Sequence, residues 1–250
     1  MRVDFRQLAP NTPPPIPGPF PASPNMALTA ARSTLGRIFF QRCFYLFMAL
    51  LLLICTAPLI EPTPSGRMTL NAVNLVVVIA AVATVGLSAF SFVLAILLGA
   101  SALGCQWFAE QAGQASMLPW SWAFGAGLYV ATLVYLIGYV FRRHVITGDK
   151  LWGGAAAFLM IGALWAYLYA IVQYFYPGSF AIGGTPAQLG TAEFIYFSFT
   201  VLTSTGFGDL TPYSPQARSL CIVEQVAGAL FVAILIARLA GVYPPRERDA

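Results

Sequence analysis

Charged side chains are scarce in this 250-residue chain. They make up 9% of it, whereas apolar residues make up 58%, and the mean hydropathy is +0.75. Soluble domains carry about 25% charged residues, so a water-soluble globule of this composition would lack polar surface. We therefore expect an all-α membrane protein in one polytopic unit. The net charge of +4 comes without an arginine–aromatic or lysine-rich cluster, so we expect no nucleic-acid partner.

Residue sets for metal binding and catalysis are also missing. The only histidine, His144, follows two arginines, and the cysteines have unrelated spacings that fit neither a zinc site nor a disulfide framework. These cysteines are Cys43, Cys55, Cys105 and Cys221. No nucleophile–base pair or phosphate-binding loop is recognisable, so we expect no enzyme and no cofactor.

The apolar residues fall into runs of membrane-crossing length. Between Met68 and Ala109 there is no charge, and one helix of that length would reach roughly 60 Å, twice a bilayer core. Two antiparallel spans fit better. We predict six spans, at about 43–60, 70–87, 89–107, 121–141, 151–174 and 217–238. The fourth holds no arginine, which argues against a voltage sensor.

The segments outside the spans complete the predicted domain organisation. Residues 1–25 hold eight prolines and are predicted to be a disordered or polyproline-II tail. Residues 26–42 are a candidate interfacial helix, and Met26 is an alternative start. A four-span domain at 43–141, a cytoplasmic linker at 142–150, a pore domain at 151–241 and a cytoplasmic tail at 242–250 follow.

The distribution of charge predicts the orientation. With six spans, most basic residues lie on one side, which the positive-inside rule makes cytoplasmic together with both termini. They are Arg32, Arg37, Arg42, Arg142, Arg143, Lys150, Arg246 and Arg248. We expect a multi-pass protein of a bacterial inner membrane.

Residues 191–216, TAEFIYFSFTVLTSTGFGDLTPYSPQ, lie between the last two predicted spans. Thr191 to Thr203 predict a helix of roughly 20 Å, too short to cross, with Thr191 as its N-cap. The two glycines that flank Phe207 suit an extended loop whose carbonyls turn one way. At membrane depth such a loop must be buried in protein or line a polar pathway, and a dehydrated cation is one partner for its carbonyls. The alternative is a simple turn between two apolar helices.

The segment TSTGFGD, residues 203–209, resembles the TTVGYGD signature of potassium-channel pore domains. YFSFTVLT and ARSLCIVEQVAGALFVAILIAR resemble the pore helix and inner helix of that family. The likeness is strong over about 150–241 and only architectural before it. It implies a re-entrant pore helix between spans five and six, and a homotetramer that forms the filter. The implied filter is Ser204, Thr205, Gly206, Phe207 and Gly208, with potassium held by the carbonyls of the first four and by the Ser204 hydroxyl.

The filter departs from the family pattern at several positions. Ser204 replaces the usual threonine, Thr205 a valine and Phe207 a tyrosine. Thr200 occupies the place of a glutamate that partners the filter aspartate, so Asp209 lacks its usual partner. Filter support is assigned to Thr203, Asp209, Thr200 and Glu224.

The sixth span contributes the remaining candidates. Glu224 is its only charge, and we predict a bracing hydrogen bond to Ser198, Thr200 or a filter backbone group, with an ion-attracting site in the pore as the alternative. Gly228 matches the gating hinge of the family, and close helix packing is the competing interpretation. Candidate cavity-lining residues are Val232, Ile236 and Ala229.

The predicted function is passive, potassium-selective conduction by a homotetramer in a lipid bilayer, with potassium as the permeant ion and no cofactor. A weakly selective monovalent cation channel is the nearest alternative. A carrier-type permease fits less well, since only one interrupted region is present where carriers have two. A structural subunit without conduction is a further alternative. The gating stimulus and any regulatory partner stay open.

Overall fold

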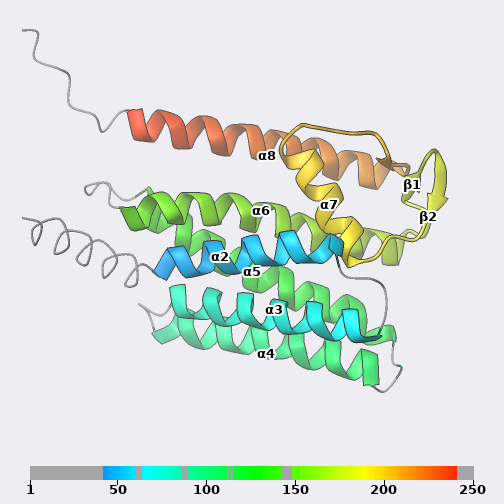
Figure 1. Ribbon diagram of the computed structural model, residues 1–250, viewed down its shortest axis with the longest axis horizontal. Helices are drawn as coiled ribbons and strands as arrows, with labels where there is room; N and C mark the ends of the chain where they lie inside the picture. Colours follow the sequence, from blue (N-terminus) through cyan, green and yellow to red (C-terminus); the bar gives the residue numbers. More distant parts are fainter. Residues whose placement is uncertain are drawn as a thin grey trace, which may run out of the picture. The chain divides into compact units, whose positions relative to one another are not determined.

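A computed structural model describes residues 42–59, 64–85, 89–111, 113, 115–141 and 148–240. The predicted tails at 1–25 and 242–250, nearly all of the candidate interfacial helix at 26–42, and linker residues 142–147 with His144 lie outside the described residues. Within them the elements follow in the order α2 (Arg42–Thr56), η1 (Ala57–Leu59), α3 (Pro64–Val85), α4 (Ala89–Gln111), η2 (Ala115–Met117), α5 (Leu118–Val140), α6 (Gly148–Phe175), β1 (Phe180–Ile182), β2 (Thr185–Ala187), α7 (Thr191–Leu202), β3 (Leu210–Pro212) and α8 (Pro215–Ala240) (Figure 1).

Helices form in every apolar run for which the sequence predicts a span. The charge-free stretch divides into α3 and α4, as its length requires. Four helices, α4, α5, α6 and α8, are long and apolar enough to cross a membrane. The apolar stretches within α2–η1 and within α3 are shorter, at Cys43–Leu59 and Ala72–Thr84. The protein is therefore a mostly helical membrane protein with four candidate spanning helices.

A small antiparallel sheet, in the order β2-β1-β3, departs from the all-α prediction. β1 and β2 form a hairpin whose turn, Gly183 and Gly184, has φ angles of 56° and 84°. Both angles are left-handed, which glycine adopts without a steric penalty. Strands of three residues carry too little alternation to be predicted from sequence.

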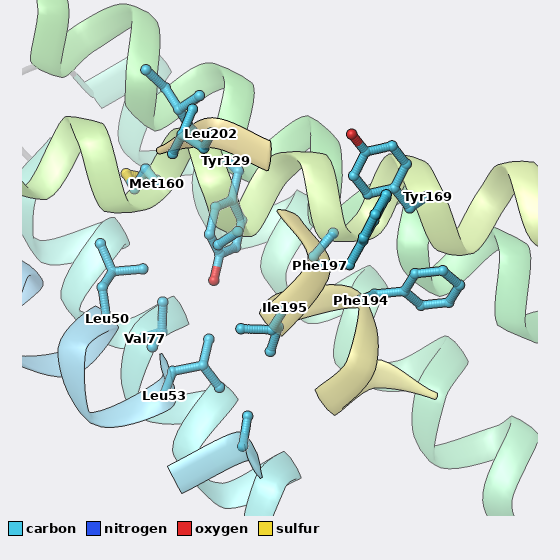
Figure 2. Packing of buried hydrophobic residues seen from close by; sticks show 14 of the residues in the cluster. Leu50, Leu53, Val77, Tyr129, Met160, Tyr169, Phe194, Ile195, Phe197 and Leu202 are labelled. Atoms are coloured by element: carbon cyan, nitrogen blue, oxygen red, sulfur yellow. The ribbon is translucent and has the colours of Figure 1, made fainter. Parts of the chain in front are cut away.

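Helix α6 is the centre of the packing and contacts α2, α5, α7 and α8. Its small residues allow this, because they let neighbouring side chains approach the helix backbone. Gly162 shows the effect most clearly, since an added Cβ would lie 2.6 Å from the Phe199 ring. Figure 2 shows core side chains from α2, α3, α5, α6 and α7, among them Leu50, Leu53, Val77, Tyr129, Met160, Tyr169, Phe194, Ile195, Phe197 and Leu202.

One carboxylate joins three helices at the start of α6. Asp149 accepts a hydrogen bond from the Cys43 backbone N–H of α2 at 3.2 Å and one from the Tyr139 hydroxyl of α5 at 2.8 Å. Because the first N–H groups of a helix have no partner within it, Asp149 caps α2 from a distant part of the chain. The four-helix segment and the last three helices are thus tied together at α6.

Candidate functional site

Helix α7 is held at its start by groups on two elements. Glu193 accepts a hydrogen bond from the Gly190 N–H at 2.9 Å, and the N-cap is Gly190. The predicted Thr191 cap is therefore wrong: Thr191 is the first residue of the helix, the cap position falls on Gly190, and the N3 glutamate reaches back to it. Gln173 of α6 fixes the preceding residue through bonds to Leu189 N–H and C=O, at 2.8 and 2.9 Å.

The end of α7 is a Schellman motif in which serine takes the position usual for glycine. Ser204 N–H donates to Val201 O and Thr205 N–H donates to Thr200 O, each at 2.9 Å. Ser204 has φ 55°, the left-handed conformation that this motif requires. The loop 203–209 therefore leaves the helix at a fixed angle.

Three successive peptide groups of this loop have a defined orientation. The N–H groups of Ser204, Thr205 and Gly206 all donate back to carbonyls of α7, the last to Thr200 O at 3.1 Å. No peptide bond here is cis, and in a trans peptide the C=O points opposite to the N–H. The carbonyls of Thr203, Ser204 and Thr205 therefore point away from α7.

Those carbonyls have no protein partner. Within the described part of the chain, no hydrogen bond reaches the carbonyl oxygens of residues 203–207. Residues 203–209 are all exposed in the single chain. The first half of the loop therefore has free carbonyl oxygens on one side and the N–H groups of Ser204, Thr205 and Gly206 satisfied on the other.

The backbone of the loop is not simply extended, which corrects the expectation from sequence. The φ angle is positive at Ser204, Gly206 and Gly208, with values of 55°, 53° and 82°, and not at the residues between them. An ordinary strand places neighbouring carbonyls on opposite sides. Alternation of the sign of φ turns every second peptide over, so that neighbouring carbonyls come to lie on the same side.

Asp209, for which the sequence offered no partner, is bonded to α7. The Tyr196 hydroxyl donates to Asp209 Oδ2 at 2.9 Å. The Tyr196 ring stacks on Phe207, with centroids 6.3 Å apart and planes inclined by 5°. Tyr196 was missed in the sequence. The signal was its place one turn before Thr200 on the same helix face.

Thr200 and Thr203 make local contacts. The Thr200 hydroxyl donates to Phe197 O at 2.8 Å and does not reach Asp209, whereas Thr200 O receives two N–H groups of the loop. The Thr203 hydroxyl donates to Phe199 O at 2.7 Å and lies 2.8 Å from the Thr205 hydroxyl.

Glu224 of α8 is fully buried and joins three helices. It accepts a hydrogen bond from the Tyr169 hydroxyl of α6, and its Oε1 lies 2.5 Å from Ser198 Oγ of α7. The predicted bond to Ser198 is thus confirmed, whereas Thr200 takes no part. A position this enclosed does not face the exposed surface of α8.

The protons available at this cluster indicate the state of Glu224. Ser198 Oγ lies 2.7 Å from Gly162 O as well as 2.5 Å from Glu224 Oε1. A hydroxyl has one proton and a carbonyl has none to give. A carboxyl group that is protonated and donates to the serine makes both contacts full hydrogen bonds, whereas an ionised one leaves the two acceptors to share the serine proton. An uncharged carboxyl also suits a site without a basic partner.

Gly228 lies directly against the end of α7. A Cβ added there would lie 2.4 Å from Leu202 O and 2.9 Å from Leu202 Cδ1. The helix α8 continues unbroken through this position. This geometry supports the close-packing interpretation of Gly228.

A cavity of about 270 Å³ lies beside α7 and the loop. Ile54 and Pro58, from the end of α2 and η1, form one side, and Thr205 and Phe207 belong to the other. The end of α2 and η1 therefore reach the immediate surroundings of the loop 203–209.

Residues 155–243 match a protein-family model described as "Ion channel". This segment is therefore similar to ion channels. It contains most of α6 together with the hairpin, α7, the loop and α8, so the match covers every feature described above except the contact with α2 and η1. No curated protein and no solved structure matches the chain.

This similarity supports passive ion transport as the role of residues 155–243. The family match begins after α5, so it assigns no role to α2–α5. In the single chain α8 leaves large apolar side chains uncovered, among them Val232 and Ile236 at 41% and 60% exposure. Ala229 is exposed as well.

Proposed function

We propose that the protein is a potassium channel whose filter is the loop 203–209 and whose permeant ion is held by backbone carbonyls. The filter comprises Ser204, Thr205, Gly206, Phe207 and Gly208, and the Ser204 hydroxyl contributes to the innermost site. Potassium is the only small ion or cofactor that this proposal requires.

The orientation of three peptide groups carries the proposal. Their N–H groups are bound to α7, so the carbonyls of residues 203–205 are directed away from it and meet no protein donor in the described part of the chain. In a membrane, lipid cannot satisfy these oxygens. A dehydrated cation can, since a ring of carbonyls replaces its hydration shell.

A homotetramer supplies that ring. One loop cannot surround an ion, and this sequence holds no second TSTGFGD-like segment. Only 22% of the apolar window of α8 is buried in the single chain, compared with 50% for α6, so α8 has surface available for other copies. The number four comes from the resemblance of the loop to potassium-channel filters.

Six spans with a re-entrant α7 complete the proposed topology. α2 and α3 then cross the membrane with α4, α5, α6 and α8, and both termini are cytoplasmic. The domain organisation is a four-span belt, a linker and a pore domain. Support comes from the α7 length of 12 residues, or about 18 Å, which is too short to cross.

Reconstitution in liposomes tests the proposal. Purified protein is expected to carry potassium down a gradient, with much smaller flux when sodium replaces potassium. Gly206→Ala should abolish the flux, because alanine at a φ of 53° strains the loop. The matched control is Gly104→Ala in α4, where an added Cβ meets nothing within 4 Å. An assembled wild-type protein that carries no potassium would refute the proposal.

A weakly selective cation channel is the second candidate, favoured by the substitutions at Ser204, Thr205 and Phe207. Phe207 lacks the hydroxyl that a tyrosine would offer at this position. The stacking on Tyr196, which bonds Asp209, supplies a different support and favours potassium selectivity. Reversal potentials under bi-ionic potassium and sodium decide between the two.

A further inference from the structure

We propose that the β1–β2 hairpin is a strap that holds the outer end of the filter in its conducting shape. The strap is defined as residues 179–187, and the inference rests on the proposed potassium-channel function. The filter is followed at once by β3, and β3 pairs with β1. The loop is therefore held at both ends, by α7 before it and by the strap after it.

The contacts between the strap and the chain after the filter are continuous. Gly183 N–H donates to Asp209 O at 3.2 Å, β1 pairs with residues 210–212, and Ser179 O accepts the N–H groups of Tyr213 and Ser214 at 2.8 and 3.2 Å. Every residue from 209 to 214 thus faces the strap. The first of these bonds directs Asp209 O toward the hairpin rather than toward the pore.

The alternating pattern of antiparallel pairs explains how two prolines fit this sheet. Gly183 and Asp209 form a hydrogen-bonded pair, so the next such pair along the strands is Ala181 and Thr211, and the backbone N–H and C=O groups of Ala181 point toward β3. The backbone groups of Phe180 and Ile182 point the other way, toward β2. Pro186 lies opposite Ala181 and Pro212 opposite Phe180. Neither proline falls where its strand must donate an N–H.

The strap is anchored in the core by an aromatic side chain. Phe180 is fully buried, and its ring lies edge-on to Tyr169, Phe194 and Phe197, with centroids 5.4 to 5.5 Å apart. Tyr169 belongs to α6 and also bonds Glu224 of α8, and the two phenylalanines belong to α7. Displacement of the strap would therefore free the outer end of the filter from the helices that position its inner end.

Two glycines with left-handed φ allow a matched test in reconstituted full-length channels. Gly183→Val strains the strap turn at a φ of 56°, and Gly113→Val strains the α4–α5 loop equally at 63°. Neither new Cβ meets an atom within 4 Å. We expect Gly183→Val to speed the decay of potassium current during sustained conduction about tenfold, as strain of roughly 1.4 kcal/mol implies. Gly113→Val should decay as the wild type does.

A disulfide that fastens the strap to β3 tests whether the current decay can also be slowed. It remains decisive if Gly183→Val does not assemble. Ile182 and Leu210 face each other in a pair without backbone bonds between them, where the side chains are closest. Oxidised Ile182→Cys/Leu210→Cys should slow the decay, and a reductant should restore the wild-type rate, whereas Ile182→Cys alone should respond to neither.

The possible failures are distinguishable. A cross-linked channel with unchanged decay, or an assembled Gly183→Val channel with wild-type decay, would overturn the strap and leave the proposed function standing. A wild-type protein without potassium flux would overturn both.

Discussion

Replacing Gly228 by alanine would put a methyl group 2.4 Å from the carbonyl oxygen of Leu202. A carbon and an oxygen that are not bonded approach to about 3.3 Å. The end of α7 and the middle of α8 would therefore have to separate by about 1 Å. The obstructing atom is backbone, so a rotamer change cannot relieve the contact.

Overpacking of this kind costs about 1–3 kcal/mol. A cost of about 2 kcal/mol in each chain lowers the population of the native packing roughly thirty-fold. Leu202 lies two residues before Ser204, so the displacement would reach the loop directly. We expect Gly228→Ala to lower both the melting temperature of the assembled protein and its potassium flux.

The double variant Gly228→Ala/Ala229→Gly separates packing from hinge bending. It restores a flexible glycine at nearly the same level of α8 but leaves the methyl group against Leu202. If packing is the role of Gly228, the double variant should stay as defective as the single one, in a thermal melt and in liposome flux. Recovery of flux by the double variant, or wild-type melting of Gly228→Ala, would show that this reasoning is wrong.

Three further variants test other contacts. Glu224→Gln should keep assembly and conductance, because an amide donates to Ser198 and accepts from Tyr169 as a protonated carboxyl does. Glu224→Leu should lower the melting temperature. A steep loss of single-channel conductance in the glutamine variant alone would favour an ion-attracting site. Tyr196→Phe keeps the ring but removes the bond to Asp209, and should reduce potassium over sodium selectivity severalfold in reversal potentials. Asp149→Ala should destabilise the protein by about 1–3 kcal/mol through loss of its hydrogen bonds, measured by thermal unfolding.

Much of the helical layout was predictable, because apolar runs and glycine breaks are local signals. The short helix α7 and the Glu224–Ser198 bond followed from the length between breaks and from the cost of a lone carboxyl in an apolar span. Both interpretations of Gly228, a gating hinge and close helix packing, came from the sequence, but the support for packing came only from the distance to Leu202 O.

The features that the sequence did not reveal depend on contacts between distant segments. The sheet needs β1 and β3 to meet around α7, and three-residue strands have no periodicity of their own. The Tyr196 bond to Asp209 depends on how the loop folds back along the helix. Ser204 at a positive φ is similarly hidden, because serine gives no left-handed signal in a sequence.

The position of η1 against α7 bears on any attempt to trim the protein to a two-helix pore. Ile54 and Pro58 cover part of α7 from outside the segment that matches the ion channel family. A fragment beginning at α6 would expose that side of α7 next to the loop 203–209. In the proposed channel, α2 and η1 would form part of the wall beside the loop 203–209, and grafting foreign sensors in their place would require a substitute for that cover.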